Sequence, residues 1–349
     1  MNALAAGLLN AVQRLDFPSV TDPWQSGAPL RLMPSIDLAV VLFAPGQPPR
    51  WANALFSREH PSGVVARIDT QAGPVQNVRF DADQRDGRDE SIAWLPDADW
   101  SQLQWLHLHG DGEHRFVAPY PASLLKLMVA VGVGLAVEAG HTSWAQMMLP
   151  LESMVVVSDN DATDTCVALL HRCGMVDTLN RRFQALGLHT LQLNGTRPDG
   201  GWRNADGAGV GQIHMTAWDT ARLLWLLDTQ APPAPWLPAG ERLLQVDTCE
   251  RLHAVLSRQE RNEVLSSGSL QGVHGWLPGF PDAPAFAHKT GTTNNYASDA
   301  GILRSDGIHA IVALITSLGR RYAPHERCAT TWHLPALGAA VHRLLKETT

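Results

Sequence analysis

Hydrophobic and polar positions alternate with a helical period in several parts of this chain. Near the N-terminus Leu4, Leu8, Val12 and Leu15 recur at helical intervals, which predicts an amphipathic helix. MTAWDTARLLWLL (215–227) shows the same i, i+3, i+4, i+7 spacing. Further helices are expected over 122–139 and roughly 161–172, and an apolar helix over about 328–346.

Strand patterns lie on both sides of these helices. Partial alternation and β-branched residues predict strands over the ranges 36–44, 63–69, 75–80, 285–293, 298–304 and 308–317. SDG (305–307) is expected to form the turn between the last two. LQWLHLH (103–109) and the HRFVAP stretch that follows it are predicted as two strands joined by a GDG turn.

This order of elements indicates a mixed α/β (α+β) fold. Strands before and after a block of helices imply one sheet built from both chain ends, with helices packed on it. The charged stretch DADQRDGRDE (81–90) reads as an exposed loop or linker. We therefore expect an accessory N-terminal helix and α/β region over 1–100, and a second unit over 101–349.

Composition narrows the class of protein. The 349 residues are 45% hydrophobic and 17% charged, as in an ordinary globular protein, and a net charge of -7 argues against nonspecific nucleic-acid binding. The longest apolar run is too short to span a bilayer, and the N-terminus lacks the cationic start of a secretory signal. We expect no membrane partner and a cytoplasmic location, or a periplasmic one if a signal has been removed. The four cysteines have no metal-ligand spacing, which favours reduced thiols.

Lysine usage is the first chemical signal. Lysine and arginine together number 27, yet only Lys126, Lys289 and Lys346 are lysines. A desolvated ammonium can give up its proton, whereas a guanidinium cannot. Lys346 lies near the C-terminus, where a solvated helix end explains it, so the other two are candidates for chemistry.

Ser123 and Lys126 form an S-x-x-K motif in PYPASLLKLMVAVG. Residues at i and i+3 share one face of a helix, and Pro121 is well placed to open that helix. Burial among leucines would depress the pKa of Lys126 and let the neutral amine take the proton of Ser123. A chance match is the alternative for this motif alone.

Two further motifs follow. SDN (158–160) precedes a predicted helix, where Ser, Asp and Asn are also ordinary caps. KTG (289–291) lies in a predicted strand, where a glycine often marks the close approach of a ligand or another backbone.

S-x-x-K, SDN and KTG in this order resemble the motif set of the serine β-lactamase and penicillin-binding-protein superfamily, most closely its class A branch. VSDNDATDTCVALL and HKTGTTNNYASDAGIL are similar to that branch around its second and third motifs. The resemblance covers roughly 100–349. It implies an antiparallel sheet with packed helices, an all-helical subdomain and an active-site serine that forms an acyl-enzyme.

The resemblance also implies the role of each acylation residue. Ser123 would be the nucleophile, Lys126 its base and Ser158 the group that relays a proton to the leaving group. Asn160 would hydrogen-bond the amide side chain of the substrate and Lys126. Asp159 would point into the structure and hold the loop.

The strand motif would bind the substrate. Lys289 would anchor a carboxylate and tune Ser158, Thr290 would share that anion site, and Gly291 would allow close approach. The backbone N–H groups of Ser123 and Thr292 would form the oxyanion hole.

Two features depart from the class A pattern. No glutamate occurs between Ser153 and Gly240, where those enzymes carry the base that activates the deacylating water. Asp199 and Asp206 are the acidic residues of the matching loop, and Asp199 is a possible deacylation base. The short spacing from Ser123 to Ser158 predicts a wider cleft than in class A enzymes.

Three functions follow from these observations. The first is a serine hydrolase acting on a β-lactam, amide or ester, with a small-molecule substrate and no cofactor. The second is a D-alanyl-D-alanine peptidase or transpeptidase, and the third is a non-catalytic binder or sensor that keeps the fold. No metal is expected, although His107, His109 and His114 lie close together in the sequence, and Trp202 and Trp236 could line a cleft.

Overall fold

A computed structural model describes residues 2–84, 98–200 and 213–349. Its centre is a six-stranded antiparallel sheet in the order β11-β12-β13-β3-β4-β5. The strands are β3 (Ile36–Leu42), β4 (Arg50–Phe56), β5 (Val64–Val65), β11 (Phe286–Thr292), β12 (Ala297–Ser305) and β13 (Ile308–Thr316). Strands from both ends of the chain therefore meet in one sheet, as predicted, with β3 paired to β13. The expected division at residue 100 stays a prediction.

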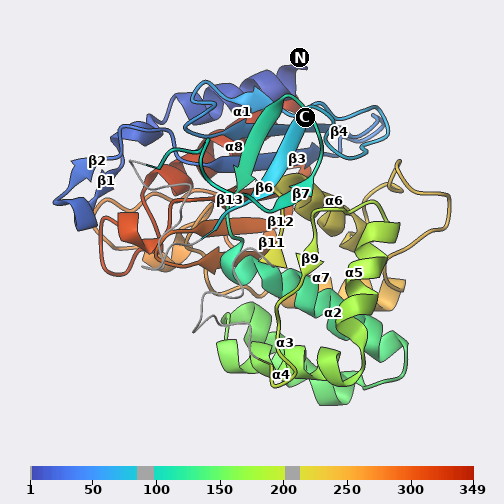
Figure 1. Cartoon of the computed structure of the whole chain (residues 1–349). Helices are drawn as coiled ribbons and strands as arrows, with labels where there is room; N and C mark the ends of the chain where they lie inside the picture. The colour runs from blue at the N-terminus through green and yellow to red at the C-terminus, as the bar shows by residue number, and fades with distance from the viewer. Residues whose placement is uncertain (1, 85–97, 201–212) are drawn as a thin grey trace.

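Alternation along the strands gives the sheet two apolar faces. On one face Leu38 and Val40 join a core with Leu8 of α1 (Ala3–Gln13) and Leu337 and Val341 of α8 (His333–Thr348). Figure 1 shows these two helices, one from each end of the chain, covering that side of the sheet.

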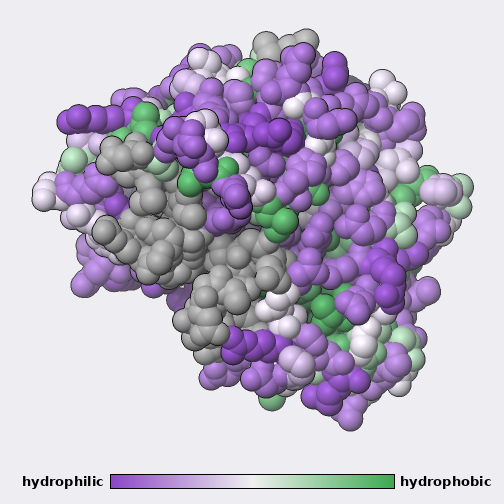
Figure 2. All heavy atoms as spheres, viewed as in Figure 1, coloured by the Kyte–Doolittle hydropathy of each residue, from purple (hydrophilic) through white to green (hydrophobic). Residues whose placement is uncertain are grey.

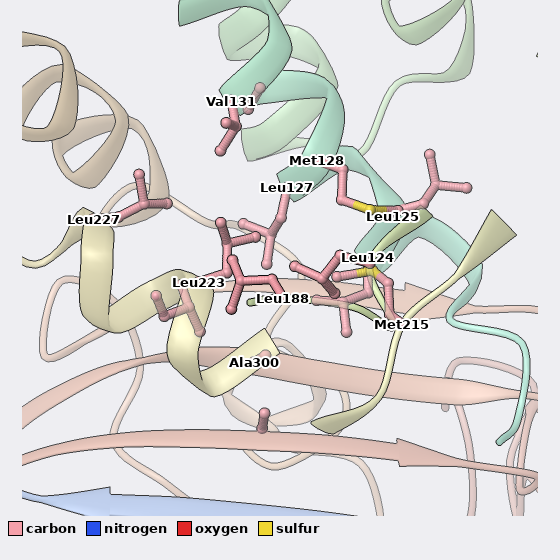
Figure 3. Packing of buried hydrophobic residues seen from close by; sticks show 14 of the residues in the cluster. Leu124, Leu125, Leu127, Met128, Val131, Leu188, Met215, Leu223, Leu227 and Ala300 are labelled. Carbon is pink, nitrogen blue, oxygen red and sulfur yellow. The ribbon is translucent and has the colours of Figure 1, made fainter. Parts of the chain in front are cut away.

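The opposite face packs against the central helices. Six helices follow in order: α2 (Lys126–Glu138), α3 (Trp144–Val156), α4 (Asn160–Arg172), α5 (Met175–Ala185), α6 (Ala217–Leu227) and α7 (Val246–Leu256). Figure 3 shows Leu124, Leu127 and Met128 packed beside Leu223 of α6, with Ala300 of the sheet below them. Lys126 therefore lies between residues that are buried in this core, Leu125 and Leu127.

A smaller three-stranded sheet contains the two strands predicted on either side of the GDG turn. Its strands are β6 (Val78–Ala82), β7 (His107–His109) and β8 (His114–Ala118), and β6 lies between the other two. The strands on either side of the GDG turn therefore do not pair directly. Gly110 and Gly112 let the turn lie against β6, because a Cβ at either position would lie within 2.2 Å of the backbone of residues 77–78. The turn crosses closely over the start of β6.

Several other strands and helices differ from those predicted from the sequence. The strand expected over 63–69 is reduced to β5, and β4, α3, α5 and α7 were not predicted. Short strands make up two further pairs, β1 (Thr21–Asp22) with β2 (Ala28–Pro29) and β9 (Gln192–Leu193) with β10 (Ile213–His214). Most of the charged stretch 81–90 lies outside the described residues.

The surface view agrees with the composition. On the face shown in Figure 2 hydrophilic residues predominate and apolar ones are scattered. Among the helices of the described part of the chain, none combines the length and apolar character that crossing a membrane requires. All four cysteines are free thiols, as expected.

Candidate active site

Ser123 lies in a short 3-10 turn, η4 (Ala122–Leu125), between β8 and α2. The α-helix begins only at Lys126, so the predicted helix over 122–139 opens with one tighter turn. Ser123 is half-buried, whereas Leu124 and Leu125 are fully buried beneath it. Ala122, directly before the serine, has a left-handed backbone with φ 52°. The turn thus presents Ser123 from a firmly packed base.

The start of this turn is held against β11 and β12. The Ser298 hydroxyl donates to the carbonyl of Pro121 at 2.5 Å. A Cβ on Gly291 would lie 2.6 Å from the backbone nitrogen of Leu124 and 2.7 Å from the oxygen of Pro121. The glycine of the KTG motif is therefore required for close contact between β11 and the turn that carries Ser123, as the strand pattern had indicated.

Lys126 is fully buried, and its Nζ faces the SDN segment. Nζ lies 2.6 Å from the backbone oxygen of Ser158, 2.9 Å from Asn160 Oδ1 and 3.1 Å from Ser158 Oγ. The backbone oxygen of Asp159 is 3.4 Å away. These oxygens replace the water that burial removes from the amine.

The SDN segment joins α3 to α4, and it both turns the chain at Ser158 and caps the start of α4. Ser158 has a left-handed backbone with φ 61°, and Asn160 is the first residue of α4. Asp159 is exposed, and its carboxylate caps α4 by accepting from the Ala162 N–H at 2.6 Å. The expectation that Asp159 points into the structure is wrong, because the free N–H groups of the helix start take its carboxylate instead.

Lys289 approaches the same hydroxyl from the sheet. Its Nζ lies 3.1 Å from Ser158 Oγ and donates to the backbone oxygen of Thr290 at 2.7 Å. Burial, followed by the charge of Lys126, holds the pKa of Lys289 well below its usual range, although Asp299 and Glu263 oppose this shift. The structure thus brings together Lys126, Ser158, Asn160 and Lys289.

A polar network behind β11 was not found from the sequence. His288 is buried on the opposite side of the strand from Lys289, where Nδ1 lies 2.6 Å from Asp299 Oδ1 and Nε2 lies 2.9 Å from Asn262 Oδ1. The second oxygen of Asp299 accepts from the Leu265 N–H at 3.1 Å. This network fixes β11 from behind. Strand alternation alone places His288 on the side away from Lys289, but no motif pointed to its partners Asp299 and Asn262.

The proposed roles of the other predicted residues, in substrate binding and deacylation, stay predictions. Thr290 is buried, and Thr292 ends β11 opposite Ala297. Asp199 is exposed in the loop that precedes residue 201, and Asp206 lies outside the described residues. Deacylation by Asp199 therefore stays a prediction.

The histidines and tryptophans noted in the sequence were considered as possible metal ligands or cleft-lining residues, and the structure gives the contacts of four of them. His107 lies 3.3 Å from Asp81, His109 stacks on His189 and His114 meets His60 edge to face. Within the described ranges, no three His, Cys, Asp or Glu side chains are arranged to hold a metal ion. The indole N–H of Trp236 donates to the backbone of Leu186, and its ring covers Arg222, so this tryptophan packs against structural neighbours. Trp202 lies outside the described residues.

Comparisons with solved structures support the fold. A beta-lactamase from Sphaerobacter thermophilus is 14% identical and is matched over 97% of this chain and 95% of its own, with a TM-score of 0.51. A beta-lactamase from Desulfarculus baarsii is 14% identical over 98% of both chains, with a TM-score of 0.50. At this identity the likeness concerns the fold alone. No curated protein matches the chain.

A family model provides the remaining comparison. The model described as the beta-lactamase enzyme family matches residues 149–331, more than half of the chain. The match includes Ser158, Asn160 and Lys289 but begins after Ser123 and Lys126, whose assignment rests on their motif and on the geometry described above. The chain belongs to the beta-lactamase enzyme family.

Proposed function

We propose that the protein is an active-site serine hydrolase that acts on a β-lactam, amide or ester through a covalent acyl-enzyme. One observation carries the proposal: the buried Nζ atoms of Lys126 and Lys289 both lie 3.1 Å from Ser158 Oγ, and Lys126 follows Ser123 by three residues in the sequence. A purely structural role gives no reason to bury two amines around one hydroxyl.

In acylation, Ser123 Oγ attacks the carbonyl carbon while Lys126, as a neutral amine, accepts its proton. The backbone N–H groups of Ser123 and Thr292 stabilise the oxyanion. As the bond from the carbonyl carbon to the leaving nitrogen or oxygen breaks, Ser158 passes its proton to the leaving group and regains one from the Lys126 ammonium, 3.1 Å away.

Substrate binding falls to the SDN and KTG segments. Asn160 donates from its amide to the acyl side chain of the substrate, since its oxygen already faces Lys126 at 2.9 Å. Lys289 and Thr290 bind a carboxylate of the substrate, and Gly291 keeps β11 close to the nucleophile.

The rate of deacylation distinguishes this proposed hydrolase from a second candidate function, a penicillin-binding activity. With no glutamate between Ser153 and Gly240, Asp199 or Lys126 itself would have to activate the water. Slow deacylation would favour a D-alanyl-D-alanine peptidase-like, penicillin-binding activity, in which the acyl-enzyme persists.

The test uses a chromogenic cephalosporin and a p-nitrophenyl ester, with absorbance followed over time and the intact mass of the protein recorded. Turnover supports the hydrolase, and a lasting adduct on Ser123 supports the penicillin-binding candidate. The Ser123→Ala variant should show neither. Absence of both from the wild type would overturn the proposal for these substrates.

A second variant tests the base. Lys126→Arg keeps the positive charge but cannot accept a proton, so acylation should fall by about 100-fold or more. If the variant acylates as fast as the wild type, Lys126 is not the base.

A further inference from the structure

The first strands of the chain contact the loop that follows the last strand of the sheet. β1 and β2 form an antiparallel hairpin, which Figure 1 shows at the left edge of the molecule. β1 contacts the short 3-10 turn η6 (Arg320–Tyr322), which comes after β13. Neither segment belongs to the three motifs. Two parts of the chain that are 299 residues apart therefore lie side by side.

A buried ion pair joins these two segments. Arg321 Nε donates to both carboxylate oxygens of Asp22 at 2.9 Å, and Nη2 of the same guanidinium donates to one of them. Only 7% of the Arg321 side chain and 2% of the Asp22 side chain are exposed, and the guanidinium carbon lies 4.8 Å from the ring centre of Trp24. Loss of either partner would leave a buried charge without compensation, so the pair is a firm link between hairpin and loop.

The backbone of η6 extends this link to the turn between β11 and β12. The Arg320 N–H donates to the backbone oxygen of Thr293 at 2.8 Å, and the Arg321 N–H donates to that of Asn294 at 2.9 Å. Arg321 therefore binds Asp22 with its side chain and the turn with its backbone.

Close packing leaves this turn little room to move. A Cβ on Gly319 would lie 2.3 Å from the backbone oxygen of Thr293 and 2.5 Å from the backbone nitrogen of Tyr296, so the loop needs glycine where it crosses the turn. The turn is also closed on itself, because the Thr293 N–H donates to the Tyr296 oxygen at 2.9 Å. Its position is thus set by the position of η6.

The turn lies at the edge of the candidate active site. Thr293 directly follows Thr292, whose backbone N–H is a proposed oxyanion donor. Tyr296 is fully buried, and its ring meets that of Tyr120 edge to face at 5.7 Å, three residues before Ser123. The turn therefore borders both residues whose N–H groups are proposed to form the oxyanion hole.

We propose that Asp22 and Arg321 are positioning residues for acylation: their ion pair fixes η6, and η6 fixes the turn that places the Thr292 N–H in the oxyanion hole. This inference rests on the proposed function and gives the first strands of the chain a part in it. Both residues act through the backbone of the turn rather than on the substrate. A donor stabilises an oxyanion only when it is aimed at it in advance, so a small displacement lowers the rate.

Loss of the pair should slow acylation without weakening substrate binding. The oxyanion forms only on the way through the transition state, so a displaced Thr292 N–H lowers the maximal rate and leaves affinity nearly the same. In Arg321→Gln we expect the maximal acylation rate to fall about tenfold, while the half-saturating concentration stays within about twofold. A pair that only stabilises the fold would leave both quantities unchanged in the folded protein.

A chromogenic cephalosporin measures both quantities. With the protein in excess, the absorbance change reports ring opening in a single turnover, and its rate is followed at several protein concentrations. Wild type, Arg321→Gln, Asp22→Asn and the double variant are compared. Because the two residues act as one unit, the second substitution should add little to the first. Fully additive effects, or maximal rates of both single variants within about twofold of wild type, would overturn the inference. Asp22→Asn keeps the shape of the carboxylate, so it tests the link even if Arg321→Gln does not fold.

Arg304→Gln is the matched control. Arg304 pairs with the fully buried carboxylate of Asp228, but it lies at the other end of β12 from the turn. Its loss should reduce stability and leave the maximal acylation rate within about twofold of wild type. An equal fall of rate in Arg304→Gln and Arg321→Gln would overturn the inference, because lowered stability would then explain both.

Hydrogen exchange tests the link without any substrate. The backbone amides of residues 293–296 should exchange faster in Arg321→Gln and Asp22→Asn than in wild type, and at the wild-type rate in Arg304→Gln. Unchanged exchange of this turn in the first two variants would overturn the inference. Failure of the proposed function would look different: wild type would show no ring opening and no adduct on Ser123, while exchange would still decide whether the pair fixes the turn.

Discussion

Two residues of the candidate active site have left-handed backbones although neither is glycine. Ala122 has φ 52° and Ser158 has φ 61°. This conformation costs an L-residue about 1–2 kcal/mol, and such costs are concentrated at functional sites. Here the two residues turn the chain sharply at the points where Ser123 and the Ser158 hydroxyl are presented. Motif spacing identified both serines but carried no sign of this backbone geometry.

Replacement of Ala122 tests how strictly this turn is packed. Because Ala122 is buried and its φ is positive, Ala122→Val should lower the free energy of unfolding by about 2–3 kcal/mol. Ala122→Gly, which tolerates the same φ, should stay within about 1 kcal/mol of wild type. Urea unfolding of both variants provides the measurement, and equal losses would show that the backbone at Ala122 is not constrained.

At the scale of elements, the contact between β11 and η4 decides whether the motifs meet. Gly291 approaches the backbone of Pro121 and Leu124, and Ser298 ties Pro121 from the next strand. The S-x-x-K turn and the KTG strand are thus held together by backbone contact, whereas the SDN segment is joined to them by the two lysines.

Gly291→Ala should separate these two elements. The added Cβ would collide with the backbone atoms of Pro121 and Leu124, which can move only if the whole η4 turn shifts. We therefore expect the acylation rate of the folded protein to fall at least tenfold. Rates come from intact mass after quenching, and far-ultraviolet circular dichroism reports the fold.

Gly7→Ala in α1 is the matched control. Its Cβ would lie 2.3 Å from the side chain of Leu344 in α8, so it should reduce stability. It should nevertheless leave the acylation rate of the folded protein within about threefold, because α1 and α8 cover the opposite face of the sheet from η4. An equal loss of rate in both variants would mean that lowered stability alone explains the effect.

Which elements the sequence predicted depends on how clear their patterns are. The strands rich in β-branched residues and the amphipathic α1, α6 and α8 were predicted because burial sets their period. β4 was missed because RWANALF has no β-branched residue and carries a polar Asn53. The side-chain amide of Asn53 donates to Asp37 Oδ1 and to the backbone oxygen of Leu38 in the neighbouring strand, which the sequence pattern could not show. α3 was missed because it contains Pro150, which normally interrupts a helix.

For the candidate site, too, the sequence predicted the residues of short motifs and missed the residues that reach the site from elsewhere in the sheet. Motif spacing predicted Lys126, Ser158, Asn160 and Lys289 as site candidates, and the structure places these four side chains together. It could not find Asp299 or Ser298, which act through distant pairing across the sheet, nor the outward turn of Asp159.

At the scale of the whole molecule, Asp37 links the sheet to the helical layer. It is fully buried in β3, where its carboxylate accepts from the Ala217 N–H at the start of α6 at 2.8 Å and from Asn53 at 2.7 Å. Burial raises the pKa of Asp37 to about 7, against the lowering effect of these two hydrogen bonds. The junction therefore carries a carboxyl group that is protonated in mildly acidic solution.

This shift predicts a pH dependence of stability with a definite sign. The folded protein holds the proton of Asp37 more tightly than the unfolded chain, so its contribution to stability is lost as the pH rises from about 4 to about 7. Asp37→Asn imitates the protonated form. The free energy of unfolding of the variant minus that of wild type should rise with pH by up to about 1.4 kcal/mol per unit in this window. Urea titrations at several pH values measure the difference, and a constant difference would contradict the prediction.

The pairing of β3 with β13 has a consequence for how the protein is made. β3 is synthesised early, yet the strand beside it is complete only when Thr316 has been added. Until then β3 and β4 remain an unfinished fragment with an apolar edge that could pair with the wrong partner. The ribosome must therefore add every residue up to Thr316 before the strand that carries Lys289 can be locked into a finished sheet, so a nascent chain released before that point should not form the proposed acyl-enzyme.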